Sequence, residues 1–435
     1  MIVTFTAAIV LLLSNLLRVH CIYQKMLNFV LIANPENRRV AFLQQALTHF
    51  NLPPATIVDY ADLISGKQNL AQFNTPNTII RFDSPEKNFD IDKAIIAAGF
   101  NVSDDGEHQR ISPGEAMELE FDKGRILYPR QWYLGWRYLL QKWETLFTPL
   151  LACGEGLGVG YFMNHPQDIA VMFDKPACHE RFSRHNIPVP HSLGKIHNYE
   201  HLREQMQTQE IERVFVKLSH GSAASGVVAY RVNSRFESAI TTVERVRENG
   251  ETLLYNSRKI SHYTRHEEIA DIINILTAEG VQVEEWLPKA HLQGCGFDVR
   301  VVVINAEAQH IVVRLGKSPM TNLHLGNERG DTEEFLAKVG VENWEMMKRT
   351  CEQAAALFPD SLYCGVDLLI LPDWKTHAIL EINAFGDLLP GIFCNGMDTY
   401  TSEVKAILGR DKVDKEDKVD KVDKVDKGDY SPIIH

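Results

Sequence analysis

The chain has 435 residues, of which 45% are hydrophobic and 23% are charged, fractions that are ordinary for globular domains. They exclude a collagen-like or wholly disordered chain, and the length predicts about three domains. The 45 Lys and Arg against 57 Asp and Glu give a net charge of −12, which argues against binding along a nucleic-acid backbone. The seven cysteines stand singly, so we predict neither a zinc ribbon nor a disulfide framework, and a reducing cytoplasm fits best.

Both ends of the chain differ from its middle. Residues 2–17 are apolar and invite comparison with a signal peptide or membrane anchor, but no Lys or Arg precedes them and no A-x-A site follows. We expect the fold to begin near Met26, with residues 1–25 as an extension outside it, although anchoring through residues 1–20 stays an alternative. The Lys-Val-Asp repeats of 411–435 are too polar to form a core and predict a disordered tail.

Between these ends, short β-rich runs alternate with longer amphipathic stretches, a pattern typical of an α/β fold. Runs at 29–32, 56–58 and 78–82 predict strands. The segment 129–150 lies between prolines and repeats Trp and Leu at helical spacing, which predicts a helix with a buried aromatic stripe. The glycine-rich stretch 153–160 does not fit the dinucleotide-binding G-x-G-x-x-G, so we interpret it as a loop.

The first segment with chemical character is 169–190, which predicts an apolar strand, then Asp174 and Lys175, then a helix. A later strand ends in Lys217 and leads into a loop of small residues. The loop residues that can approach a ligand are Gly221, Ser222, Ser225 and Gly226. Backbone N–H groups in such a loop can bind phosphate oxygens while the lysine adds charge. A tight hairpin with a surface lysine is the simpler alternative.

Acidic and basic residues mark the next two predicted strands. The strand at 281–287 carries Glu284 and Glu285, and the strongly β run after it begins with Asp298 and Arg300. Burying the last two is costly unless each meets a partner or a ligand, and pairing with each other is one alternative.

Two further apolar strands, 365–370 and 378–383, carry Asp367, Glu381 and Asn383. Glu381 and Asn383 are two residues apart and therefore share one face of their strand. Three such oxygen ligands suit Mg²⁺, whose remaining ligands are usually phosphate oxygens and water. A solvent-facing polar stripe explains any one of these residues, but it explains the set less well.

The order of these parts resembles the ATP-grasp superfamily, from about Asp174 to Gly391. The resemblance implies a pre-ATP-grasp α/β domain followed by two α+β lobes that clasp ATP. The implied nucleotide-binding residues are Lys175 and Lys217 at the phosphates, Gly221, Ser222, Ser225 and Gly226 in the loop, Glu284, Glu285 and Leu287 at the adenine, and Asp298. The implied catalytic residues are Arg300, Arg314 and Asn322. The implied metal ligands are Asp367, Glu381 and Asn383.

Some features depart from the family pattern or stay open. Leu218 follows the strand lysine where Pro is usual, which should affect loop rigidity more than charge. The residue that binds the ribose is not evident, and the alternatives are His291, Gln293 and Asp298. The polar segment 312–330 is predicted to be a loop that lines an anionic pocket. His262 and His266 are four apart on a predicted helix, but no third ligand completes a zinc site.

Together these features predict an ATP- and Mg²⁺-dependent (or Mn²⁺-dependent) ligase that activates a small-molecule or peptide carboxylate as an acyl-phosphate for attack by an amine or a thiol. The alternatives are a phosphotransferase, a non-catalytic nucleotide-binding subunit of a biosynthetic complex and a membrane-anchored structural protein. We expect a cytoplasmic enzyme that binds no nucleic acid and that can form homo-oligomers. The predicted domains are 26–160 and 161–410, the latter with a small lobe at about 175–285 and a large lobe at about 286–410.

Overall fold

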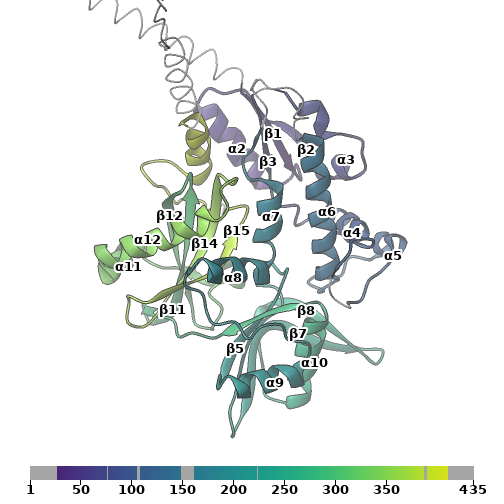
Figure 1. Cartoon of the computed structure of the whole chain (residues 1–435), viewed down its shortest axis with the longest axis vertical. Coiled ribbons are helices and arrows are strands. Elements are labelled where there is room, and N and C mark those ends of the chain that lie inside the picture. Colours follow the sequence, from purple (N-terminus) through teal and green to yellow (C-terminus); the bar gives the residue numbers. More distant parts are fainter. Residues whose placement is uncertain are drawn as a thin grey trace, which may run out of the picture.

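The computed structural model describes residues 27–75, 77–104, 108–147, 161–222, 224–386 and 389–409. Within these residues the strands form three sheets, and Figure 1 shows the N-terminal sheet at the top and a five-stranded sheet at the bottom. The fold is mixed α/β, as predicted. The stretches 1–25, 153–160 and 411–435 lie outside the described residues. In the described part of the chain, no helix is long and apolar enough to cross a bilayer.

The N-terminal sheet is parallel and has the strand order β2-β1-β3-β4. Its strands are β1 (Asn28–Ala33), β2 (Thr56–Asp59), β3 (Thr78–Phe82) and β4 (Tyr161–Phe162). Its helices are α2 (Arg38–His49), α3 (Tyr60–Ile64), the 3₁₀ turn η1 (Leu70–Phe73), α4 (Phe89–Gly99), α5 (Pro113–Glu118) and α6 (Pro129–Phe147). The first three strands confirm the predicted runs. β3 is buried along its whole length, as expected for a parallel strand with elements packed on both faces.

Helix α6 confirms the predicted aromatic helix over Pro129–Phe147. Its stripe faces inward, with Trp136 and Trp143 buried in the core. α6 also crosses α4 closely at Gly135, because a Cβ there would lie 1.8 Å from the carbonyl oxygen of Ile95. Only glycine permits this approach, so the crossing at Gly135 holds α6 against α4.

The five-stranded sheet is antiparallel, with the order β8-β7-β6-β5-β9. Its strands are β5 (Arg213–Leu218), β6 (Val227–Val232), β7 (Glu237–Glu248), β8 (Glu251–Tyr263) and β9 (Val281–Glu285). Helices α9 (Tyr199–Thr208) and α10 (His266–Ala278) accompany it in Figure 1, and Leu202 and Ile272 share a core with Val216. Because side chains alternate along β5, Phe215 and Lys217 point to the opposite face.

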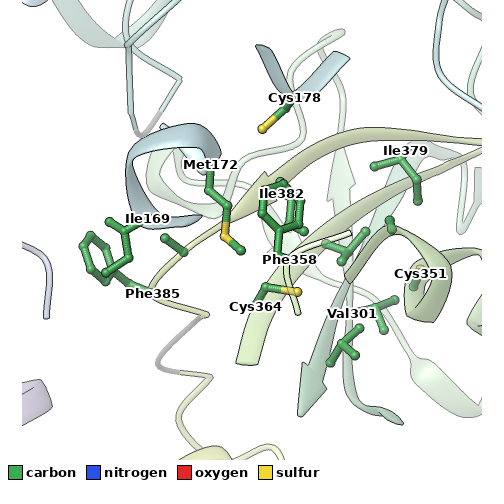
Figure 2. Packing of buried hydrophobic residues seen from close by; sticks show 14 of the residues in the cluster. Ile169, Met172, Cys178, Val301, Cys351, Phe358, Cys364, Ile379, Ile382 and Phe385 are labelled. Carbon is green, nitrogen blue, oxygen red and sulfur yellow. The ribbon is translucent and has the colours of Figure 1, made fainter. Parts of the chain in front are cut away.

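The six-stranded sheet is also antiparallel, with the order β13-β12-β11-β14-β15 and β10 added at β11. Its strands are β10 (His291–Leu292), β11 (Cys295–Ile304), β12 (Glu307–Gly316), β13 (Glu328–Arg329), β14 (Tyr363–Ile370) and β15 (His377–Asn383). The accompanying helices are α7 (Pro166–Met172), α8 (Lys175–Arg184), the 3₁₀ turn η2 (Leu323–Leu325), α11 (Thr332–Val339), α12 (Val341–Ala356) and helical residues 399–409. Figure 2 shows part of the core, where Met172 of α7 lies beside Ile382 of β15.

Three local predictions were wrong. The apolar run at 169–173 is helical and belongs to α7, because Pro166 opens the helix and His165 caps it, while Ile169 and Met172 lie one turn apart in the core. His262 and His266 do not share a helix, since the first lies in β8 and the second begins α10. The segment 312–330 is not all loop, because it contains the end of β12 and all of β13.

Candidate active site

A cleft lies between the five-stranded and the six-stranded sheets. The following predicted site residues line it: Lys175, Lys217, Gly221, Ser225, Glu284, Glu285, Leu287, Asp298, Arg314, Asn322, Asp367 and Glu381. The remaining predicted residues, which do not line it, are Ser222, Gly226, Arg300 and Asn383. The cleft therefore gathers residues that are up to about 200 positions apart in the sequence.

The register of the six-stranded sheet explains how its charged residues meet. Asp298 of β11 is directly opposite Arg314 of β12. On the other side of β11, Arg300 is opposite Asp367 of β14, which is in turn opposite Glu381 of β15. Directly opposed residues in antiparallel strands have their Cβ atoms about 5 Å apart, on the same face of the sheet. Four neighbouring strands thus present one continuous row of charge.

Four of these charged residues, together with Lys289, form a connected series of buried ion pairs. We call this series the charge ladder: Lys289, Asp298, Arg314, Asp367 and Arg300. Nε of Arg314 lies 2.6 Å from Oδ1 of Asp298, and its Nη2 lies 2.9 Å from Oδ2 of Asp367. Nη2 of Arg300 donates to the same Oδ2 of Asp367 at 3.0 Å. The alternative that Asp298 and Arg300 pair with each other is wrong, because each pairs across strands.

The charge ladder keeps both of its carboxylates ionised. Burial opposes the ionisation of Asp298, but Arg314 and Lys289 outweigh burial and hold the pKa of Asp298 below the usual range for an aspartate. Burial acts in the same way on Asp367, and Arg300 and Arg314 lower its pKa in spite of it. Asp298, Arg314 and Asp367 therefore face the cleft as fixed charges.

Lys289 is a cleft residue that the sequence analysis missed. Its Nζ donates to Oγ1 of Thr321 at 2.7 Å and lies 3.4 Å from Oδ2 of Asp298. Burial lowers its pKa, and Asp298 opposes that shift. The sequence carried one usable signal, since Lys289 is the sole lysine between the predicted adenine-binding strand and the Asp298 strand.

Two lysines lie on the opposite side of the cleft, one paired with a carboxylate and the other bonded to a backbone carbonyl. Lys217, at the end of β5, forms an ion pair with Glu284 of β9, so Glu284 is not unpaired. Lys175, the first residue of α8, donates from Nζ to the carbonyl oxygen of Gly221 at 2.5 Å. In the described residues Lys175 forms no ion pair, and it stands at the positive end of a helix dipole. The ammonium of Lys175 is therefore a charge that a ligand can neutralise.

The other predicted residues hold local structure. The backbone N–H of Leu287 donates to the carbonyl oxygen of Glu285 at 3.1 Å. Oδ1 of Asn322 accepts from the N–H of His324 at 2.9 Å, and Nδ2 of Asn383 donates to the carbonyl oxygen of Gly365 at 3.3 Å. Leu287 and Asn322 line the same cleft as the charge ladder, and Asn383 lies two residues after Glu381 on β15.

Two antiparallel sheets that enclose one charged cleft define a two-lobed α/β architecture, and solved structures share it. No protein-family model and no curated protein sequence matches the chain. The chain is similar to D-cycloserine synthetase DcsG, at a TM-score of 0.50 and 13% identity over 88% of this chain and 99% of that chain. At this identity the likeness shows the fold alone.

Two further solved structures are similar to the chain. The ATP-grasp ligase PsnB, complexed with a minimal precursor, matches at a TM-score of 0.47 and 16% identity over 88% of this chain and 98% of that chain. The macrocyclase MdnC from Microcystis aeruginosa MRC, bound with the precursor peptide MdnA, matches at 0.46 and 12% over 87% and 97%. The chain has the ATP-grasp fold, as the order of its motifs predicted.

Proposed function

We propose that this chain is an ATP-dependent ligase that joins a carboxylate to an amine. The observation that carries the proposal is the charge ladder, which shares a cleft with Lys175 and Lys217. Buried cations and anions of this density are costly in a fold unless they bind charged ligands or each other. A nucleotide and a carboxylate are ligands of matching charge.

In this proposal the small lobe binds the nucleotide phosphates. Lys175 and Lys217 neutralise phosphate oxygens, and the loop after β5 supplies backbone N–H groups. Gly226 has a φ of +65°, and a Cβ there would lie 2.5 Å from Cδ1 of Leu218, so glycine is required where this loop turns back into β6. The loop can therefore pack closely against the end of β5 beside the phosphates.

The metal would be held by Asp367, Glu381 and Asn383. Among the described residues no group of three or more His, Cys, Asp and Glu can hold a metal ion, so the proposed set depends on an amide as its third ligand. Asp367 and Glu381 are direct cross-strand partners, and Asn383 follows two residues later on β15, so hard oxygen donors are adjacent, as Mg²⁺ or Mn²⁺ requires. Such an ion, when bound, neutralises charge on the phosphate oxygens.

The reaction then proceeds by displacement at phosphorus and at carbon. A carboxylate oxygen of the substrate forms a bond to the γ-phosphorus, and the bond to the β-γ bridging oxygen breaks and releases ADP. The amine nitrogen next bonds to the acyl carbon, inorganic phosphate leaves with the former carboxylate oxygen, and the amine proton passes to solvent. Arg300 and Arg314 bind the anionic oxygens at both stages, so catalysis is mainly positioning and charge neutralisation.

Oxygen transfer provides the sharpest test. The full-length chain is incubated with ATP, Mg²⁺ and pools of amino acids, peptides and small carboxylates, and ADP release and product masses are recorded. With a carboxylate labelled in its oxygens by the heavy isotope, we expect one labelled oxygen in the released inorganic phosphate. A stable phosphorylated product would instead indicate a phosphotransferase, and nucleotide binding without ADP release in any pool would indicate a non-catalytic subunit.

A further inference from the structure

A buried histidine lies in the loop after β5 and has no part in the proposed chemistry. The side chain of His220 is only 1% exposed. Its ring stacks face to face on Tyr133, with centroids 3.8 Å apart and planes 9° apart. Its Nε2 lies 3.4 Å from Oδ2 of Asp174, and neither ring nitrogen makes a hydrogen bond within the described residues. A buried ring held on two sides has one orientation.

The two residues that contact His220 lie on helices that pack in a different hydrophobic core from the strand that leads into its loop. Tyr133 lies in α6, where its hydroxyl donates to the carbonyl oxygen of Ala170 in α7. Asp174 caps α8 by accepting from the N–H of Ala177 at 3.0 Å. Helices α6, α7 and α8 share one hydrophobic core, whereas Leu218, at the start of the loop, belongs to the core of the five-stranded sheet. His220 therefore bridges two separate cores.

Lys175 reinforces the same junction. Its backbone N–H donates to the carbonyl oxygen of Ser219 at 3.1 Å, and its Nζ donates to that of Gly221 at 2.5 Å. Three consecutive loop residues, 219–221, are thus held from outside the five-stranded sheet. We call this set of contacts the clasp: Tyr133, Asp174 and Lys175 on one side and His220 on the other.

We propose that His220 is a positioning residue that fixes the start of the loop over the nucleotide phosphates, so that nucleotide affinity depends on the stack with Tyr133 in α6. The inference rests on the proposed function, because it takes the loop as the phosphate-binding element. A loop of small residues samples many conformations, and ordering it on binding costs affinity. The clasp orders one end of the loop before the nucleotide arrives.

The test measures nucleotide affinity apart from turnover. Binding of the Mg²⁺ complex of a non-hydrolysable ATP analogue to the full-length chain is followed by calorimetry, and folding is followed by thermal unfolding. We expect His220→Ala to weaken binding by up to about tenfold, the range that loss of one aromatic stack allows. His220→Phe, which keeps an aromatic ring to stack on Tyr133, should restore most of the affinity.

His310 supplies a matched control. It is also buried, with the whole residue 1% exposed against 7% for His220, and its Nε2 lies 2.9 Å from the carbonyl oxygen of Met397, but it does not line the cleft. His310→Ala should lower the unfolding temperature as His220→Ala does and leave nucleotide affinity within about twofold, a change typical of sites without ligand contact. A purely structural role for His220 would make the two variants bind equally well, which would overturn the proposal.

A double-mutant cycle tests whether the stacked rings act as a unit. Tyr133→Ala should weaken binding, and the double variant with His220→Ala should bind no more weakly than the worse single variant, because the same contact is lost. Effects that multiply would overturn the proposal. A wild-type chain that binds no nucleotide would overturn the proposed function itself, whereas wild-type binding that His220→Ala leaves unchanged would overturn only the role of the clasp.

Discussion

Two regions of this molecule bury arginine–carboxylate pairs, and they serve different ends. Every residue of the charge ladder except Arg300 lines the cleft, and its Asp367 contacts two arginines. The second region, which we call the sealed cluster, consists of Arg81, Glu403, Tyr363 and Tyr400. There Arg81 pairs with Glu403, and its guanidinium lies 4.6 Å from the centroid of each tyrosine ring. Ion pairs alone therefore do not mark a site.

The two regions differ in the groups that cover their charged side chains. In the sealed cluster both aromatic faces enclose the guanidinium, and the pair joins β3 to helical residues 399–409. Burial raises the pKa of Glu403, and Arg81 opposes that shift without reversing it. In the charge ladder the cations prevail and hold the aspartate pKa values low. A charged ligand can reach only the ladder, so only the ladder should respond to one.

The same substitution in the two regions tests this contrast most strongly. Glu381 neighbours the charge ladder and makes no hydrogen bond or ion pair in the described part of the chain. We expect Glu381→Gln to reduce ATP turnover by about 1000-fold, as loss of a charge-stabilising group in an active site does, and to change the free energy of unfolding by less than about 0.5 kcal/mol. ADP release and urea unfolding measure both quantities. Turnover near the wild-type rate would remove Glu381 from the proposed site.

Glu403→Gln should show the reverse pattern. It leaves the buried Arg81 without its anion, so we expect the free energy of unfolding to fall by about 3–5 kcal/mol. Nucleotide affinity of the folded fraction should stay at the wild-type value. Urea unfolding and calorimetry on the same preparations make Glu381→Gln and Glu403→Gln controls for each other. A fall in affinity without a fall in stability would show that the sealed cluster communicates with the cleft.

The sequence predicts the strands and the list of charged residues, but it does not predict their partners. The apolar runs of β3, β5 and β14 are local signals, and they suffice for the elements. The pairing of Arg300 with Asp367 depends on β11 lying beside β14, with 67 positions between the residues. Register between distant strands is set by the whole sheet. For the same reason the roles of Lys289 and His220, which depend on segments remote in sequence, were not predicted.

Glu279 is an intermediate case, because it is a half-buried carboxylate next to a backbone donor. The backbone N–H of Arg130 donates to Oε2 of Glu279 at 3.2 Å, while the guanidinium of Arg130 binds Asp104. Burial raises the pKa of Glu279 to about 7, and the hydrogen bond from Arg130 only partly opposes this. The charge of Arg130 also lowers the pKa of Glu279, but this guanidinium is paired with Asp104, whereas the charge ladder gives each of its carboxylates two cations.

The sign of the pH effect follows from that shift. Since the folded pKa lies above the unfolded value, the folded state binds the proton more tightly, and this contribution is lost as the pH rises from about 4.5 through about 7. Glu279→Gln should therefore leave stability unchanged at pH 4 and raise it by about 3 kcal/mol at pH 8. Urea unfolding of both proteins across this range measures the difference. A difference that does not grow with pH would contradict the assigned pKa.

Replacement of whole pairs should have only a small effect on stability, and it separates the two regions by its effect on turnover. A buried ion pair exchanged for apolar side chains of similar volume is often neutral, because the desolvation cost disappears together with the attraction. Arg81→Met combined with Glu403→Leu should therefore stay within about 1 kcal/mol of the wild-type free energy of unfolding. The same exchange in the charge ladder, Arg314→Met with Asp298→Leu, should also fold, yet it should abolish ADP release because Arg314 then no longer binds the anionic oxygens in the cleft. If both double variants kept turnover, the charge ladder would be as structural as the sealed cluster.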